Sequence, residues 1–197
     1  MEYLTRGARS IWPAVFHCCL ASLSLATAAT TDSIQRLAQP GHVLLLRHAN
    51  APGVGDPPAM KLSDCSTQRN LDDIGRNQAR ALGQRLRAAG VTNAHVYTSD
   101  LCRCRETAQL LNVGTVEALP ALNSTVRLTE QQRVSQIAAL HAFMEKLPRD
   151  GVPVVFVTHQ VIVTALTDQS PDSGGGVILR LLPKGRTERV AEVPAAT

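Results

Sequence analysis

Two histidines and two arginines stand where apolar runs of this chain end. Arg47 and His48 follow the run at residues 43–46, and His159 closes the run "VVFVTH". Arg103 lies in "YTSDLCRCRETA", just after a third, shorter run. Arginine forks match the oxygens of a phosphate group bidentately, and an imidazole can act as a nucleophile or as a proton carrier. Together these residue types predict chemistry on a phosphate monoester.

Positioning such a set requires that the four side chains meet at one edge of a sheet. The runs at 42–48 and 152–159 predict strands buried on both faces. Ligands of open α/β sheets bind outside the carboxyl ends of the strands, and both histidines fall there. Arg103 falls on the first turn of a following helix, whose N-terminus also favours an anion. Like charge from the arginines disfavours protonated His48 and leaves its lone pair free to attack phosphorus.

Strands alternate with helices along the chain, which predicts an α/β fold: a three-layer α/β/α sandwich around a mostly parallel central sheet. Residues 160–167 are either a strand or the first turns of a helix. The loop 49–70, rich in Gly, Pro and Asp, is of the kind that carries function. The remaining predictions are strands over 42–48, 95–99, 113–119 and 152–159, helices over 71–90, 100–111 and 129–147, and a closing hairpin over 176–182 and 187–193.

Capping residues mark where the predicted helices begin. The three starts are Asp72 or Asp73, Asp100, and Thr129, in chain order. In the first helix the spacing predicts an apolar face made of Ile74, Ala81, Leu82 and Leu86. The many arginines of residues 69–90 are expected to form an exposed polar face.

Composition limits the classes of function. The chain has 197 residues, which suggests one domain, and its 44% hydrophobic content is enough for a core. Its net charge of +4 is only mildly basic, and aromatic residues make up 3%. Without aromatic and basic residues interleaved, the sequence argues against a nucleic-acid partner.

The N-terminal segment predicts export. Arg6 and Arg9 precede an uncharged, apolar or small stretch over residues 11–29, which ends in the small-residue cleavage pattern Ala26-Thr27-Ala28. A retained membrane anchor is the rival interpretation, weakened by a proline, a histidine and several Ser and Thr residues within the stretch. We therefore expect a signal peptide at 1–28, a mature domain over 29–197 without stable membrane insertion, and a periplasmic or secreted location.

Export makes a disulfide plausible among the three remaining cysteines, Cys65, Cys102 and Cys104. Cys102 and Cys104 lie two apart on a predicted helix and point to different sides, so they should not pair. Cys65 pairs with one of them, or all three are free thiols. The spacing lacks paired Cys-x-x-Cys motifs, so no metal site is expected.

Four segments in order resemble the histidine phosphatase superfamily, the phosphoglycerate-mutase-like group, and in particular its small, single-domain, exported members. They are "LLLRHANAPG", "RNLDDIGRNQARALGQRL", "YTSDLCRCRETAQLL" and "VVFVTHQVIVTAL", spanning about residues 42–166. The resemblance implies that His48 is a nucleophile that becomes phosphohistidine. It also implies that Arg47, Arg103 and His159 bind and polarise the transferring group, without a metal or another cofactor.

The sequence departs from the mutase pattern around both histidines. Ala49-Asn50 replaces the usual Gly-Glu, and Gln160 stands where Gly, or the proton-donating Asp of the phytase-like branch, is common. Asn50 is a candidate for contact with a phosphate oxygen. Ser99 either positions the Arg103 helix or touches substrate. No clear general acid is found, and Glu130 and Glu117 remain weak candidates.

These observations predict an exported, metal-independent histidine phosphatase that hydrolyses phosphomonoesters or related phosphate groups. Its substrate would be a small phosphorylated molecule, and an envelope sugar phosphate is a reasonable guess from location and family analogy. The alternatives are a phosphoryl-transferring mutase and a low-turnover phosphate-binding module on the same fold.

Overall fold

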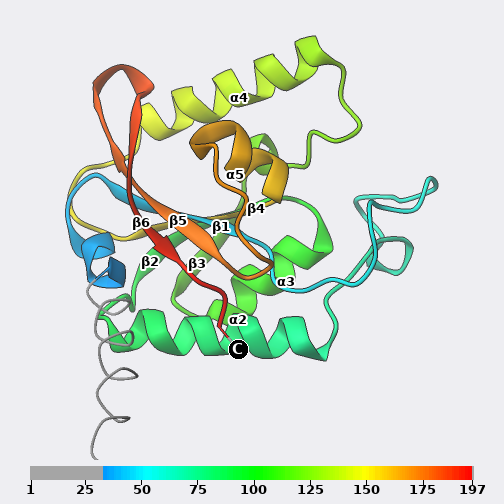
Figure 1. Cartoon of the computed structure of the whole chain (residues 1–197), viewed down its shortest axis with the longest axis horizontal. Coiled ribbons are helices and arrows are strands. Elements are labelled where there is room, and N and C mark those ends of the chain that lie inside the picture. The colour runs from blue at the N-terminus through cyan, green and yellow to red at the C-terminus, as the bar shows by residue number, and fades with distance from the viewer. Residues whose placement is uncertain (1–32, 197) are drawn as a thin grey trace, which may run out of the picture.

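A computed structural model describes residues 33–196 and shows an α/β fold built around one six-stranded sheet (Figure 1). The predicted signal peptide, residues 1–28, lies outside the described residues. The strand order is β3-β2-β4-β1-β5-β6. The strands are β1 (His42–Arg47), β2 (Ala94–Thr98), β3 (Gly114–Ala118), β4 (Val154–Thr158), β5 (Gly176–Leu181) and β6 (Thr187–Val193).

The sheet is mostly parallel, as the sequence predicts. The pairs β1–β4, β2–β4 and β2–β3 are parallel, whereas β5 pairs antiparallel with both β1 and β6. The closing hairpin is therefore confirmed, and it extends the sheet beyond β1. This order puts β1 and β4 in the middle, with all their apolar side chains buried.

Helices cover both faces and complete three layers (Figure 1). On one face α2 (Asp73–Ala88) and α3 (Cys102–Leu111) pack against alternate strand residues such as Leu44 and Val155. On the other face α4 (Glu130–Glu145) and α5 (Gln160–Thr167) pack against Leu45 and Phe156. The open choice for residues 160–167 is settled, because they form a helix.

The predicted apolar face of α2 is confirmed at Leu82 and Leu86, which are buried, and at Ala81, which packs partly buried against the core, but it is wrong at Ile74. Ile74 is 64% exposed, and the buried residues are Gly75, Ala79, Leu82, Gly83 and Leu86. Two glycines rotate the buried face away from Ile74, because they let the helix backbone approach its neighbours. A Cβ on Gly75 would lie 2.1 Å from the Asn50 carbonyl oxygen, and one on Gly83 would lie 2.1 Å from that of Leu111.

Two of the three predicted caps are confirmed. Asp72 accepts a hydrogen bond from the Gly75 amide, and Thr129 forms a capping box at the start of α4. Asp100 does not cap α3, which begins after Leu101 without a side-chain cap. The Asp100 carboxylate instead accepts a hydrogen bond from the side chain of Asn123.

A disulfide fastens the loop 49–70 to the start of α3. It joins Cys65 to Cys102 with a Cα–Cα distance of 5.7 Å, whereas Cys104 is a buried free thiol. Burial is the main cause that raises the pKa of Cys104 to about 12, so it stays protonated. The open pairing is thereby settled, and the loop is tied one residue away from Arg103.

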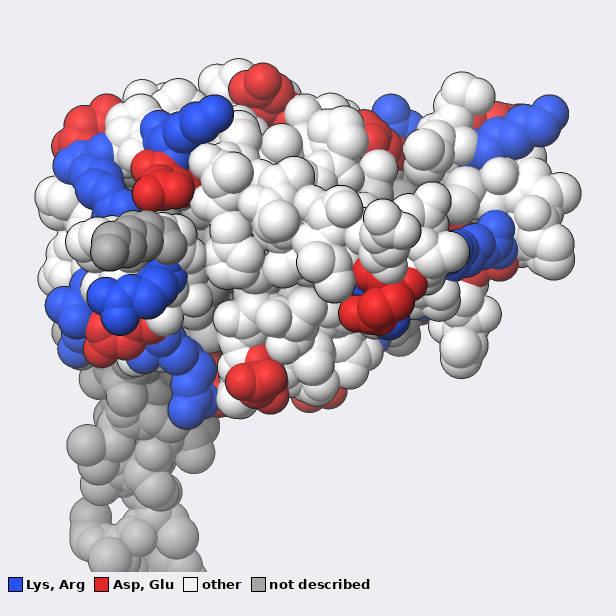
Figure 2. Space-filling view, turned by 90° about the horizontal axis from the view of Figure 1, so that it is seen from above, with Lys and Arg blue, Asp and Glu red and all other residues white. Residues whose placement is uncertain are grey.

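Charges of both signs mix on the face that α4 and α5 cover. Figure 2 shows Lys and Arg beside Asp and Glu toward the two ends of this face, with a broad uncharged region between them. Separately, among residues 33–196 no helix has the length and apolar character needed to cross a membrane.

Candidate active site

The carboxyl ends of β1 and β4 bring the two predicted histidines together. Arg47 lies opposite Thr158 in the parallel register, and the His48 amide donates to the Thr158 carbonyl at 2.9 Å. His48 and His159 therefore leave neighbouring strands at the same level, and their ring centroids are 5.4 Å apart. The side chains are almost completely enclosed, with 3% and 4% exposure.

Arg103 links both imidazoles. Its Nε donates to Nε2 of His48 at 3.1 Å, and its Nη2 lies 3.2 Å from Nδ1 of His159. The third donor edge of the guanidinium, Nη1 and Nη2, meets both carboxylate oxygens of Asp56 at 2.7 and 3.1 Å. Arg103 is thus fixed by three partners, and it is 2% exposed.

Hydrogen bonds define the protonation of His48. Its Nδ1 lies 2.8 Å from the carbonyl oxygen of Ala49, which can only accept, so Nδ1 carries the proton. The other nitrogen, Nε2, accepts from Arg103 and holds a lone pair. Burial, together with the smaller effect of the charges of Arg103, Arg69 and Arg47, lowers the pKa of His48 to about 3. A neutral imidazole with an unprotonated Nε2 is the state that nucleophilic chemistry requires, once Arg103 gives up its hydrogen bond to this nitrogen.

His159 is in the opposite tautomer from His48. Because Nδ1 accepts from Arg103, the proton resides on Nε2, which donates to the Ser99 hydroxyl at 2.9 Å. The Ser99 hydroxyl in turn donates a hydrogen bond to Oδ1 of Asn123 at 2.9 Å. Burial, followed by the Arg103 charge, lowers the pKa of His159 well below its ordinary value. Ser99 therefore positions His159, a role that the sequence did not suggest, and its hydroxyl also accepts from the Leu101 amide at 3.3 Å, at the start of the Arg103 helix.

Two further arginines border this cluster, and in both of them Nε is buried without a hydrogen-bond partner. Arg47 donates through Nη1 to the Pro171 carbonyl at 3.0 Å, and Arg69 donates to the carbonyls of Ala51 and Gly53. Burial is the main cause that lowers the pKa of each. Buried donors without partners are rare, and here they point to an anion.

Arg69 corrects the sequence analysis, which assigned it to an exposed polar face. It is half-buried, and its charge lowers the pKa of both His48 and His159. Residue type alone could not separate it from the exposed arginines of α2. The local signal was its place in the loop before the Asp72 cap, outside the helix itself.

The weaker candidates lie outside the cluster. Asn50 donates from its side chain to Asp72 at 2.8 Å, so its predicted contact with a phosphate oxygen stays a prediction. Glu130 is exposed and pairs with Arg133 on α4. Glu117 lies in β3 at the sheet edge, and neither glutamate contacts the two histidines. Asp56, which the sequence analysis did not single out, is the carboxylate that reaches Arg103.

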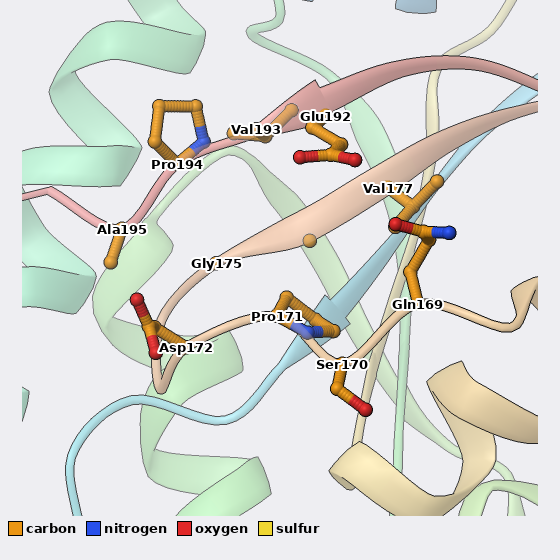
Figure 3. Close-up of a pocket in the computed structure, with 11 residues that line it drawn as sticks. Gln169, Ser170, Pro171, Asp172, Gly175, Val177, Glu192, Val193, Pro194 and Ala195 are labelled. Atoms are coloured by element: carbon orange, nitrogen blue, oxygen red, sulfur yellow. The ribbon is translucent and has the colours of Figure 1, made fainter.

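A cavity of about 410 Å³ lies beside the cluster (Figure 3). The loop 169–175 separates the two, because its Pro171 lines the cavity while accepting the hydrogen bond from Arg47. The same loop is bonded to the end of β1, since the Gly174 amide donates to the His48 carbonyl at 3.0 Å. The polar lining of the cavity comes from Gln169, Ser170, Asp172 and Glu192.

No group of three or more His, Cys, Asp or Glu side chains in the described part of the chain is arranged to hold a metal ion. The donors of the cluster itself are imidazoles and guanidiniums, which suit an anion. The metal-independent chemistry expected from the family resemblance stays a prediction.

Comparison with known proteins agrees with this geometry. The sequence profile of the histidine phosphatase superfamily (branch 1) matches residues 43–133. The match covers His48, Arg69 and Arg103, and the chain as a whole has the histidine phosphatase fold. Residues 43–133 of the chain are therefore similar to the histidine phosphatase superfamily, branch 1.

Individual relatives are distant. The mitochondrial serine/threonine-protein phosphatase Pgam5 of Drosophila grimshawi is 36% identical over 70 residues, which are 36% of this chain and 22% of that protein. The chain thus matches about a fifth of the length of that relative. A structure of the protein histidine phosphatase SixA complexed with tungstate aligns with a TM-score of 0.56 and 19% identity, over 78% of this chain and 96% of the other.

A phosphoserine phosphatase mutant from Entamoeba histolytica, in complex with phosphoserine, also shares the fold. Its TM-score is 0.53 at 11% identity, over 77% of this chain and 96% of that one. At these identities the structures establish the fold alone.

Proposed function

We propose that this protein is a phosphatase that hydrolyses small phosphomonoesters through a phosphohistidine formed at His48. One observation carries the proposal. A neutral, buried imidazole with its Nε2 lone pair fixed toward Arg103 lies within reach of the charges of Arg47, Arg69 and Arg103. This arrangement combines a nucleophile with a site for a dianion.

The reaction begins when the phosphoryl group enters between the guanidiniums. The buried Nε donors of Arg47 and Arg69 gain acceptors, and Arg103 exchanges imidazole contacts for phosphate oxygens. Nε2 of His48 attacks phosphorus while the bond to the leaving oxygen breaks. Charge that spreads over the equatorial oxygens is met by donors already in place, which is the main source of rate in such transfers.

The second half of the reaction returns the enzyme. Water attacks the phosphohistidine, the P–N bond breaks, and inorganic phosphate leaves. The hydrogen bond from Nδ1 to the Ala49 carbonyl stabilises the phosphorylated imidazole, because it holds the proton on the nitrogen that does not react. His159, neutral in the free enzyme, lies close enough to take part as a hydrogen-bond partner of the phosphoryl oxygens.

For the substrate we propose a sugar phosphate of the cell envelope. This class is supported by the proposed envelope location and by analogy with the family. The cavity beside Arg47 adds no support, because the loop 169–175 separates it from His48. The proposed location rests on the N-terminal sequence alone, so the protein would act in the periplasm or outside the cell. Mass spectrometry of the purified protein tests this, since cleavage after Ala28 gives a chain starting at Ala29.

Incubation of the full chain with an aryl phosphate tests the reaction. We expect release of phosphate together with an acid-labile label on His48. Label without release, rescued by a hydroxyl acceptor, would instead indicate a mutase. Phosphate binding without label or release would indicate a binding module and would overturn the proposed activity.

A further inference from the structure

Asp56 is a buried carboxylate inside the cluster. It lies in the loop that follows His48, and both its oxygens accept hydrogen bonds from Arg103. Its side chain is 10% exposed, and that of Arg103 is 3% exposed. Asp56 is fixed from behind as well, because Arg127 donates to its carbonyl oxygen and to that of Pro57. The chain therefore directs a carboxylate at the site where a phosphate is expected.

One guanidinium separates this carboxylate from the nucleophile. Arg103 uses Nε for His48 and its Nη atoms for Asp56, so the two groups flank opposite edges of the same fork. An in-line transfer places the leaving oxygen on the side of phosphorus opposite the attacking nitrogen. With the phosphoryl group bound against Arg103, that oxygen points away from His48, toward the loop that carries Asp56.

Other carboxylates near the site are already engaged elsewhere. Asp100 accepts a hydrogen bond from Asn123, and Asp172, which lies in the loop 169–175 and lines the neighbouring cavity, acts through its charge on Arg47. Glu130 pairs with Arg133 on the surface of α4. Asp56 is the carboxylate that shares a partner with the nucleophile.

We propose that Asp56 is the general acid that protonates the leaving oxygen, an inference that rests on the proposed phosphatase function. The bound dianion takes donors of Arg103 away from the carboxylate and sets negative charge beside it. Both changes favour the protonated carboxyl group. As Nε2 of His48 bonds to phosphorus and the P–O bond breaks, the carboxyl proton moves to the departing alkoxide. Asp56 is left as a carboxylate.

The same group completes the second step. The Asp56 carboxylate accepts a proton from the attacking water as the oxygen bonds to phosphorus and the P–N bond breaks. Phosphate leaves, His48 regains its lone pair, and the carboxyl group is protonated for the next turnover. Protons balance over the cycle, because the one given to the leaving group is the one taken from water.

Asp56→Asn tests the proposal, because the amide keeps the size of the side chain but cannot donate an acidic proton. Steady-state kinetics are measured with dinitrophenyl phosphate, whose leaving group needs no proton, and with glycerol phosphate, whose leaving group does. We expect kcat to fall about 10²–10³-fold with glycerol phosphate and less than about 10-fold with dinitrophenyl phosphate. The basic limb of the pH profile of kcat should disappear with glycerol phosphate, because kcat reports the enzyme–substrate complex, and Asp56→Glu should recover part of the lost rate.

Other results overturn the assignment. An equal loss with both substrates would mean that Asp56 only positions Arg103, and a gain would mean that it blocks the site. Glu130→Gln is the matched control and should leave both rates unchanged. Circular dichroism and thermal unfolding identify a misfolded variant, in which case the Asp56→Glu comparison decides. Wild-type protein that releases no phosphate from either ester would overturn the proposed function itself, and this assignment with it.

Discussion

The strand ends and the loop 49–70 supply the same site by different physical means. His48 and His159 are set by the backbone, because they follow adjacent parallel strands whose register is fixed by a ladder of hydrogen bonds. Asp56 and Arg69 are set by side chains and by a disulfide, since the loop around them has no ladder of its own. The nucleophile is therefore fixed by the fold, whereas the proposed proton donor Asp56 and part of the anion site depend on the loop.

Removing the nucleophile should have the largest effect, and it tests the strand-end half of the comparison. For His48→Ala we expect kcat to fall about 10⁴-fold or more, as for other nucleophiles, because the variant lacks the Nε2 that forms the phosphohistidine. The acid-labile phosphoryl label should vanish. The exposed His95→Ala is the control and should keep full activity. A labelled His48→Ala protein would show that another residue is the nucleophile.

Arg103→Lys tests the guanidinium that connects the histidines at the strand ends to Asp56 in the loop 49–70. A lysine keeps the positive charge but cannot contact His48, His159 and Asp56 in one plane. We expect kcat/KM for an aryl phosphate to fall about 10²–10³-fold, comparable to the loss of a positioned oxyanion donor. Arg76→Lys, on the surface of α2, should change it little. A loss below 10-fold would mean that charge alone suffices.

Breaking the disulfide tests the loop half. The disulfide closes a loop between cysteines that are 37 residues apart in sequence. For the double variant Cys65→Ser, Cys102→Ser we therefore expect the free energy of unfolding to fall by about 3–4 kcal/mol. Because the bridge ends one residue from Arg103, activity should fall as well. Urea unfolding and steady-state kinetics measure the two effects. Dithiothreitol should reproduce both in the wild type and should not affect the variant.

The sequence could predict the strand-end half for a physical reason. A continuous apolar run indicates a buried strand. The polar residue that ends such a run must lie at the edge of the sheet, as His48 and His159 do. The same logic failed for Arg69 and Asp56, because their positions depend on contacts between segments far apart in the chain. Arg69 lies among arginines that are expected to form an exposed polar face, and the composition of the loop 49–70 predicts a functional loop without indicating that Asp56 is one of its functional residues. Ile74 shows the same limit, since the glycines that rotate α2 act through close packing that periodicity does not reveal.

Burial of neutral histidines at the strand ends should make the fold sensitive to acid. An unfolded histidine binds a proton below pH 6.5, whereas His48 in the fold does so only near pH 3. The free energy of unfolding therefore falls as pH drops from 6.5 toward 3, by about 2 kcal/mol at pH 5 from this residue. Urea unfolding at pH 7 and pH 5 measures the difference. His48→Ala should reduce this difference in the free energy of unfolding, and His95→Ala should not. The same difference in the wild type and in His48→Ala would contradict the low pKa of His48.

The smallest predicted effect concerns the bridge that positions His159. Ser99 accepts from Nε2 of His159 and donates to Asn123, which keeps the lone pair of Nδ1 directed at Arg103. In Ser99→Ala the Nε2 proton of His159 loses its acceptor, so the tautomer with the proton on Nδ1, which faces a donor of Arg103 and displaces it, becomes populated. We expect kcat to fall about 10-fold, equivalent to about 1.4 kcal/mol, with little change in KM. Ser99→Thr, which keeps the hydroxyl, should recover most of the rate, while Ser66→Ala in the exposed loop should be neutral. A change in KM alone would indicate that Ser99 touches substrate, and it would move this residue from the support of the strand ends to the binding surface.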